Sequence, residues 1–441
     1  MKNRIIKRVF LLSLCLVFVT LSGCTPFSGN FDLLMNPPAL SGEMAPIGKA
    51  LDNGISGKYT LKFPASGDNK NAVNMIDLDG DGQNEAVATY STTREGAVTM
   101  NICVVDNVNG KWEVVGSQSI LGAGVEKVIF KDLNSDGTAE IIVGWNVFGS
   151  TQKTLCVYSY TLGTVLSLLT ENYTEFITCD LDDDFTNDLL IINLDSAEQT
   201  ATASYFNISE SGISEVGNCE LNPNVTGYLQ PVLTKLTSGK FCVYLEAYKG
   251  AGVTTEIIYF ADGVLKNPLY NKETTKSITD RTTVITSRDF DGDSNLEVPI
   301  MTALPVEERF SVNETAYLTT WCRFDGNEFV PILYTLLNYT DGYFFALNEE
   351  QTKNITVVRN VQNRERVIYE YDYQQNRFGE EIFSIKTVSK AAFDSGAYGG
   401  DGYEKIGENN DIVYLIKFFQ TNKQGFTKED ILKSFNIIRE E

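Results

Sequence analysis

The amino-acid sequence predicts an all-β fold made of repeated units of about 53 residues. Three observations lead to this prediction. An acidic segment of nine residues recurs along the chain, short apolar runs rich in β-branched residues flank each copy, and a glycine turn follows at a similar distance. The chain has 441 residues, of which 43% are hydrophobic, and this is enough to bury a large core.

Residues 1–23 have the pattern of a lipoprotein signal peptide. The basic residues of this segment all lie in residues 1–8, and residues 9–20 form an apolar run of 12. A membrane-spanning helix needs roughly 20 such residues. The tetrapeptide LSGC, which ends at Cys24, resembles the bacterial lipobox. The resemblance implies that Cys24 carries palmitate-type lipid and that the protein is anchored on the extracellular face of the bacterial cell membrane. An ordinary secretory signal is the alternative.

Three further segments follow the signal peptide. Residues 24–57 contain the lipidated cysteine and a flexible tether rich in proline and glycine, with one short helix expected around Ile47–Leu51. Residues 58–390 hold the repeats. Residues 391–441 are expected to form a strand and a helix, because Thr427–Asp430 resembles a capping box and apolar residues follow it at helical spacing.

The charge and the missing histidine exclude several functions. There are 36 Lys and Arg against 58 Asp and Glu, so the net charge is 36 − 58 = −22, and there is no histidine. The negative field repels nucleic acid and favours cations, so no nucleic-acid partner is expected. Without histidine, Ser-His-Asp and Cys-His catalysis and histidine-ligated metals are excluded.

The positions of the cysteines indicate whether they are buried thiols or disulfide-bonded. Six cysteines remain after the one inside the leader and Cys24 are set aside, and several lie in apolar β-like runs. We expect buried thiols that act as small hydrophobic residues. Disulfide pairing is the alternative for an exported protein.

The acidic segments offer oxygen ligands at alternating positions. Side chains at positions 1, 3, 5 and 9 and a backbone carbonyl at position 7 can surround one Ca²⁺. The predicted ligands of the first two copies are Asp77, Asp79, Asp81, Gln83 and Glu85, and then Asp132, Asn134, Asp136, Thr138 and Glu140. Those of the other two copies are Asp180, Asp182, Asp184 and Asp188, and then Asp289, Asp291, Asp293 and Glu297. Turns without metal are the alternative.

A second marker keeps phase with the acidic segments. Hairpin-like runs surround five turn glycines, namely Gly110, Gly163, Gly212, Gly263 and Gly326, which are spaced by 53, 49, 51 and 63 residues. A copy without acids is expected near residue 235. A sixth unit is predicted to contain the strand FFAL and a turn at Gly379. Each unit then supplies four antiparallel strands.

Four antiparallel strands per unit make the blade of a β-propeller. We predict a propeller of six to seven four-stranded blades with a small C-terminal segment that contains a helix. The seventh blade would combine residues 411–419 with residues 59–63. The alternative is fewer blades with a C-terminal α+β unit.

The nine-residue segments resemble the calcium loops of FG-GAP and VCBS repeats, as in the propellers of integrin α-subunits. The resemblance covers residues 58–390 and is most specific in the first two copies, because the third and fourth have Phe185 and Ser294 where the turn glycine is expected. The tether also resembles that of uncharacterised clostridial surface lipoproteins. These resemblances imply a scaffold, structural Ca²⁺ and a surface location.

The sequence therefore predicts a lipid-anchored cell-surface protein that acts as a binding or adhesion module for a protein or glycan. A passive scaffold of the cell envelope is the alternative, and a polysaccharide-acting enzyme with paired carboxylates is a further one. Since the chain contains no GxSxG, P-loop or HExxH motif, we predict that it is not an enzyme.

Overall fold

The computed structural model describes residues 42–94, 96–150, 152–161, 163–209, 212–274, 276–290, 292–306, 315–396, 398, 402–419 and 426–438. The signal peptide, Cys24 and Asp291 lie outside these residues. Within the described ranges strands far outnumber helices, and antiparallel pairs build the sheets, so the predicted all-β fold class is confirmed. None of the described helices combines the length and the apolar character that crossing a membrane requires.

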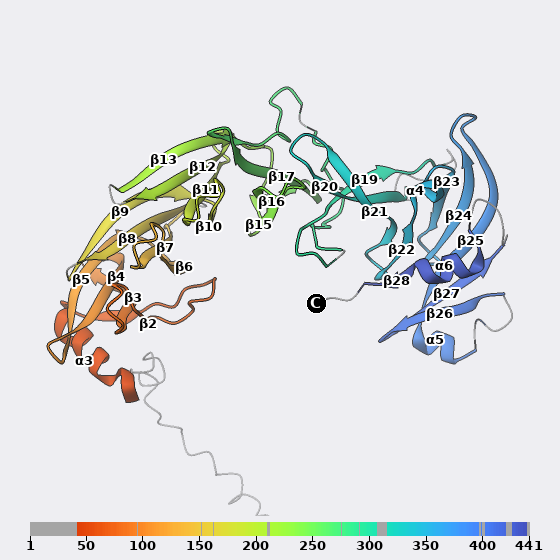
Figure 1. The fold of residues 1–441 in the computed structure, drawn as a ribbon. Coiled ribbons are helices and arrows are strands. Elements are labelled where there is room, and N and C mark those ends of the chain that lie inside the picture. The colour runs from red at the N-terminus through yellow and green to blue at the C-terminus, as the bar shows by residue number, and fades with distance from the viewer. Residues whose placement is uncertain are drawn as a thin grey trace, which may run out of the picture. The chain divides into compact units, whose positions relative to one another are not determined.

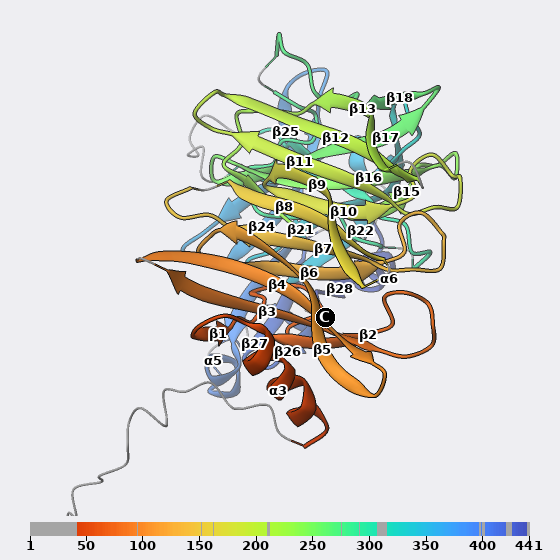
Figure 2. The same cartoon turned by 90° about the vertical axis from the view of Figure 1, so that its left-hand side faces the viewer.

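The described strands form six sheets of four or five strands, each with the antiparallel arrangement of a propeller blade (Figures 1 and 2). The first sheet contains β1 (Tyr59–Leu61), β2 (Val73–Ile76), β3 (Glu85–Arg94), β4 (Ala97–Val108) and β5 (Lys111–Leu121). The second contains β6 (Gly124–Lys131), β7 (Glu140–Asn146), β8 (Lys153–Thr161) and β9 (Thr164–Tyr173), and the third contains β10 (Glu175–Cys179), β11 (Asp188–Asp195), β12 (Thr200–Ser209) and β13 (Gly212–Glu220).

The remaining three sheets have five strands each. The fourth contains β14 (Gly227–Tyr228), β15 (Val232–Lys235), β16 (Phe241–Lys249), β17 (Gly252–Ala261) and β18 (Val264–Lys266). The fifth contains β19 (Val298–Ala303), β20 (Tyr317–Phe324), β21 (Phe329–Asn338), β22 (Tyr343–Leu347) and β28 (Phe435–Ile437). The sixth contains β23 (Ile355–Asn360), β24 (Glu365–Asp372), β25 (Arg377–Ser389), β26 (Glu404–Asn409) and β27 (Ile412–Phe418).

The two sequence markers occupy equivalent places in successive sheets. The first three acidic segments connect β2 to β3, β6 to β7 and β10 to β11, and the fourth precedes β19. The five turn glycines have φ between 75° and 118° and connect β4 to β5, β8 to β9, β12 to β13, β17 to β18 and β20 to β21. The copy without acids forms the β15–β16 hairpin, as predicted.

The sixth unit was assigned incorrectly from the sequence. Gly379 lies inside β25, and the turn before it uses Asn376, which has a φ of 49°. A Cβ atom at Gly379 would come within 2.7 Å of the Glu370 Cβ, so the glycine permits close approach of two strands rather than a turn. The FFAL run forms β22 and pairs with β21 in the fifth sheet.

The proposed seventh blade is also wrong for the described residues. β27 pairs with β25 and with β26 in the sixth sheet, whereas β1 pairs with β3 in the first. The 13 residues of β25 offer a long edge, and the β26–β27 hairpin covers it. A covered edge has no free backbone groups for another strand.

The chain divides into two compact units. One contains the described residues up to Lys127 with Thr161–Val165, and the other contains the rest. In the first unit, helix α3 (Ala45–Gly54) follows the 3-10 helix η1 (Gly42–Met44) and buries Ile47, Ala50 and Leu51 among apolar residues of β3, β4 and β5. These residues are spaced as one helix face. The short helix expected around Ile47–Leu51 is therefore present, and it packs on the first sheet.

In the second unit, neighbouring sheets share apolar cores. One core joins the third and fourth sheets through Tyr205 and Leu245, and another joins the fifth and sixth through Phe345 and Phe383. This packing buries faces that a single sheet would leave exposed. The short helices of this unit are α4 (Glu349–Thr352), α5 (Lys390–Asp394) and α6 (Lys428–Ser434), and α6 begins after Thr427, as the sequence predicts.

The six described cysteines are free thiols, and five of them are buried. Burial raises the pKa of Cys103 and Cys242 to about 12, which keeps these thiols protonated and unreactive. The expectation of buried thiols is confirmed for these residues.

Candidate metal sites in the acidic loops

The four acidic segments form loops of one backbone geometry, which we name loops 1 to 4: residues 77–85, 132–140, 180–188 and 289–297. In each loop the carboxylate at position 1 accepts a hydrogen bond from the backbone N–H at position 6, at 3.0 Å in loops 1 to 3 and 2.8 Å in loop 4. The carboxylate at position 5 accepts from the N–H at position 7, at 2.7 to 2.9 Å. The nine-residue alignment made from sequence therefore corresponds to one structure.

The loop backbone has a left-handed residue at position 6 even where glycine is missing. Gly82 and Gly137 have φ of 86° and 88°, and Phe185 and Ser294 have φ of 68° and 69°. A left-handed conformation costs a non-glycine residue roughly 1–2 kcal/mol. Loops 3 and 4 thus keep the geometry of loops 1 and 2 at an energetic cost. In loop 3 the Phe185 side chain does not offset this cost by packing, because it is 88% exposed.

The acidic residue at position 9 is buried in every loop. Glu85 and Glu140 are 2% exposed, and Asp188 and Glu297 are fully buried. In loops 1, 2 and 4 the glutamate Oε2 accepts a hydrogen bond from the backbone N–H at position 2, at 2.8 to 2.9 Å. This bond connects the two ends of each loop and directs a carboxylate toward its interior.

Loop 3 makes the same connection through an additional side chain. Asp188 is one methylene shorter than glutamate, and Tyr205 on β12 lies between it and the Leu181 N–H. The Tyr205 hydroxyl accepts from the Leu181 N–H at 3.1 Å and donates to Asp188 Oδ2. The sequence gives no indication of this role, because Tyr205 lies in a strand pattern that predicts core packing.

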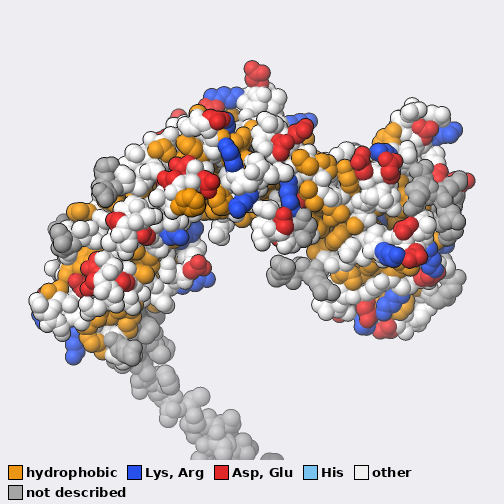
Figure 3. Space-filling model, in the orientation of Figure 1, with side chains coloured by type: hydrophobic (Ala, Val, Ile, Leu, Met, Phe, Trp, Pro, Cys, Tyr) orange, Lys and Arg blue, Asp and Glu red, His pale blue; other side chains and the backbone are white. Residues whose placement is uncertain are grey.

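Carboxylate oxygens converge inside loops 1 and 3. One oxygen each from Asp77, Asp79 and Glu85 lie within 4.8 Å of one another, and the same holds for the four aspartates of loop 3, Asp180, Asp182, Asp184 and Asp188. Burial, together with the charge of Asp79, raises the pKa of Glu85 to about 7. Figure 3 shows acidic side chains gathered in small patches on the visible face. Such groups repel one another unless a cation or protons neutralise them.

Two buried oxygen atoms in these loops indicate whether a metal ion fits there. Asp132 Oδ1 in loop 2 and Asp188 Oδ1 in loop 3 are buried and have no hydrogen-bond partner among the described residues. Buried polar atoms are nearly always satisfied, so an unsatisfied acceptor indicates a missing partner. The donor set consists of oxygen atoms, which Ca²⁺ prefers. Loops 1 to 3 therefore fit a bound Ca²⁺.

Loop 4 already contains a positive charge. Arg323 on β20 places Nη1 at 2.9 Å from Asp293 Oδ2 and Nε at 2.7 Å from Glu297 Oε1. The guanidinium thus occupies two of the predicted metal ligands, and this revises the prediction of Ca²⁺ in loop 4. Sequence reasoning missed Arg323 because it lies 26 residues beyond Glu297 in an unremarkable strand.

The structure does not change the prediction for the remaining ligands. The Gln83 and Thr138 N–H groups donate to position 5, and their carbonyls stay predicted ligands. In loop 2, Asn134 Nδ2 donates to Asp136 Oδ2 at 2.9 Å, which leaves the amide oxygen of Asn134 as the predicted ligand. Asp291 lies outside the described residues.

No protein-family model and no curated protein matches the chain. Solved structures align with it at low similarity. The periplasmic gluconolactonase PpgL of Pseudomonas aeruginosa is 10% identical over 71% of this chain and 85% of its own, with a TM-score of 0.26. The Dos1 propeller is 7% identical over 65% and 78%, with a TM-score of 0.28. The exo-β-1,3-galactanase of Phanerochaete chrysosporium is 9% identical over 81% and 88%, with a TM-score of 0.27.

These matches correct one prediction made from the sequence. We predicted that the chain is not an enzyme, but a gluconolactonase and a galactanase are among the structures that align with it. The exclusion of catalysis is therefore withdrawn.

Proposed function

We propose that this chain is a lipid-anchored protein of the extracellular face of a bacterial membrane, where its propeller-type sheets bind a protein or glycan ligand. In this proposal, Ca²⁺ bound by loops 1 to 3 stabilises the sheets. The role of the ion is structural: it neutralises carboxylates at the corner where two strands of a sheet meet.

The observation that carries the calcium part is the pair of buried oxygens without partners, Asp132 Oδ1 and Asp188 Oδ1. Leaving a buried acceptor unsatisfied costs about 1–3 kcal/mol, and a buried charge costs more. A cation at these positions removes that cost. Extracellular Ca²⁺ modules need only millimolar to sub-millimolar affinity, which suits a protein outside the cell.

The lipid anchor is supported by the sequence alone. The basic residues, the apolar run and the LSGC tetrapeptide occur in the order that a lipoprotein signal requires. We expect Cys24→Ala to abolish labelling by a radioactive or clickable fatty acid. Cys15→Ala changes a cysteine of the same leader and serves as the matched control, which should label normally. Normal labelling of the Cys24→Ala protein would exclude lipidation at this position.

The binding role is tested on a soluble form that begins at residue 25. A glycan array with and without Ca²⁺, and a reducing-sugar assay on the polysaccharides that bind, separate binding from cleavage. Retention of a glycan without release of sugar supports a binding module. Release of sugar shows catalysis, and the absence of retention on both glycan and cell-surface protein arrays contradicts the proposal.

A further inference from the structure

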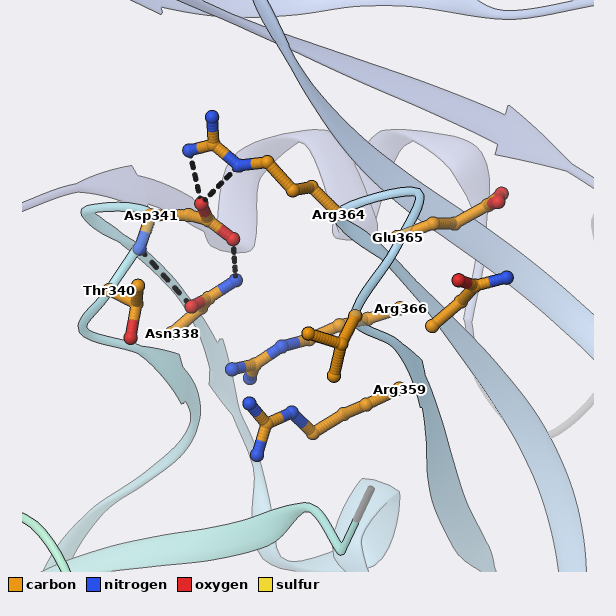
Figure 4. Close-up of a pocket in the computed structure, with 9 residues that line it drawn as sticks. Asn338, Thr340, Asp341, Arg359, Arg364, Glu365 and Arg366 are labelled. Atoms are coloured by element: carbon orange, nitrogen blue, oxygen red, sulfur yellow. Dashed lines mark hydrogen bonds and ion pairs between the residues drawn. The ribbon is translucent and has the colours of Figure 1, made fainter. Parts of the chain in front are cut away.

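A pocket in the second unit gathers basic side chains in a chain whose acidic residues outnumber its basic ones. The pocket has a volume of about 250 Å³ and lies between the turn after β21 and the β23–β24 hairpin (Figure 4). Arg359, Arg364 and Arg366 line it together with Asp341 and Glu365, so its formal charge is 3 − 2 = +1. The whole chain carries −22. A positive pocket is therefore unusual for this surface.

Arg359 and Arg366 are direct cross-strand partners on β23 and β24. Their guanidinium groups point to the same side of the pocket (Figure 4). Arg366 Nη1 donates to the Leu337 carbonyl at 2.7 Å, and Arg359 Nη1 donates to the Thr315 carbonyl at 3.3 Å. Neither makes an ion pair with a carboxylate of the described residues. Like charges directly opposite each other in a sheet are destabilising.

The acidic side chains of the pocket are engaged elsewhere. Asp341 Oδ1 accepts from Arg364 Nε at 2.9 Å and also from Arg364 Nη2, while Oδ2 accepts from the Asn338 amide at 2.8 Å. Glu365 accepts a hydrogen bond from Tyr403, and its carboxylate points away from the two guanidinium groups (Figure 4). Arg364 is thus paired with Asp341, whereas Arg359 and Arg366 have no direct carboxylate partner among the described residues.

The burial of Arg366 makes pairing of its charge with an anion more favourable. Burial lowers the pKa of Arg366, and the charge of Arg359 lowers it further, whereas Tyr343 and the charge of Asp341 oppose the shift. Arginine keeps its proton in proteins, so Arg366 remains a cation with which an anion in the pocket can pair. Thr340 and Asn360 also line the pocket and offer neutral polar groups.

We propose that the pocket formed around Arg359 and Arg366 binds an oxyanion, such as the carboxylate, sulfate or phosphate group of a small ligand. Paired guanidinium forks match such groups because two parallel N–H donors meet two oxygens. The volume admits a group of about the size of one sugar ring. The inference does not depend on Ca²⁺, since no residue of loops 1 to 4 lines the pocket.

The test is calorimetric titration of the detergent-solubilised full-length chain at low ionic strength, where screening is weak. Glucuronate, inorganic sulfate and inorganic phosphate are the probes, and glucose is the neutral control. Each titration is run with EGTA and with Ca²⁺, so that failure of the calcium proposal is seen separately. We expect at least one anion to bind and glucose to give no heat.

The variants assign the site. Arg366→Gln should weaken binding by about tenfold or more, since a charge-assisted pair is lost. Arg359→Lys keeps the charge without the fork and should weaken binding less, which provides a second readout if Arg366→Gln fails to fold. Arg377→Gln, at an exposed arginine outside the pocket, should bind like wild type. Binding of glucuronate alone identifies a carboxylate ligand, and binding of sulfate or phosphate identifies a tetrahedral one. No binding of any anion, equal binding of glucose, or unchanged affinity in Arg366→Gln overturns the proposal.

Discussion

Tyr205 donates its hydroxyl hydrogen to Asp188 and accepts a hydrogen bond from the Leu181 N–H, so that it completes loop 3. In loops 1, 2 and 4 a glutamate at position 9 makes this connection alone. A shorter acid and a tyrosine from the adjacent strand thus replace one longer acid.

This relationship predicts non-additive mutational effects. Tyr205→Phe should reduce the free energy of unfolding by about 1–3 kcal/mol, because the buried Leu181 N–H loses its acceptor. Asp188→Glu alone should clash with the tyrosine hydroxyl, whereas the double variant should recover most of the loss, since glutamate reaches the Leu181 N–H. A double-mutant cycle from urea denaturation measures this coupling.

Tyr228→Phe is the control for that cycle. Tyr228 is 8% exposed, and its hydroxyl has no hydrogen-bond partner among the described residues. Removing this hydroxyl should leave stability unchanged or slightly higher. Additive effects of the changes at Tyr205 and Asp188 would contradict the assigned bridge.

Calcium removal should destabilise the protein through loops 1 to 3. At a free Ca²⁺ concentration of ten times the Kd, each site contributes about 1.4 kcal/mol, so EGTA should lower Tm by a few degrees. Asp79→Ala, Asp136→Ala and Asp182→Ala should each remove part of this response in a calorimetric melt. Glu198→Ala, an exposed acid outside the loops, should keep the full response. A melting curve that EGTA and Ca²⁺ both leave unchanged would mean that these loops are acidic turns.

Loop 4 should gain a calcium response when its arginine is removed. Arg323→Gln leaves the fully buried Glu297 without its cation, and breaking a buried ion pair costs about 3 kcal/mol. Millimolar Ca²⁺ should then restore Tm by more than it does in wild type, because Asp289, Asp293 and Glu297 become available as ligands. Arg377→Gln, which removes an exposed arginine outside loop 4, is the control and should show the wild-type change of Tm with Ca²⁺. Equal Ca²⁺ responses in Arg323→Gln and wild type would show that the guanidinium does not take the place of a metal.

Glu256 on β17, which lies outside the acidic loops, should make the free energy of unfolding depend on pH. Burial raises its pKa to about 7, although hydrogen bonds from the Asn222 N–H and the Asn267 amide oppose the shift. The folded pKa lies above the unfolded value of about 4.5, so the folded state binds the proton more tightly. The resulting stability is present below pH 4.5 and is lost as the pH rises to 7 and beyond.

Glu256→Gln should remove this share of the pH dependence. Relative to wild type, the variant should gain stability between pH 5 and pH 8, by an amount of the order of 3 kcal/mol. Asn267 Oδ1 has no hydrogen-bond partner among the described residues, so its amide can rotate to accept from the new glutamine. Urea denaturation at the two pH values in EGTA measures the difference. The same loss of stability with pH in both proteins would contradict the raised pKa.

Local patterns predicted most of the architecture. The five turn glycines have positive φ because a hairpin turn requires it, and this local requirement is visible in the sequence. The internal hydrogen bonds that close loops 1, 2 and 4 join residues at most seven positions apart, so the sequence spacing was sufficient to predict these loops. The prediction failed at Gly379, where the glycine permits close approach of two strands rather than a turn.

Contacts distant in sequence could not be predicted from one chain. Arg323 meets Asp293 only because β20 pairs beside β19. Arg359 and Arg366 become neighbours through the register of β23 and β24, and nothing in the sequence marked either as a ligand-binding residue. The assignment of β27 to the sixth sheet likewise depends on which edge was free, a property of the assembled fold.

The six described cysteines have a consequence for the environment in which the protein works. All are unpaired, and five are buried. Folding requires no oxidant to form a disulfide among the described residues, and a reductant has none to break there. The stability of the folded chain should therefore be the same in oxidising and in reducing surroundings. The concentration of dissolved ions, rather than the redox potential, should determine how long the folded state survives.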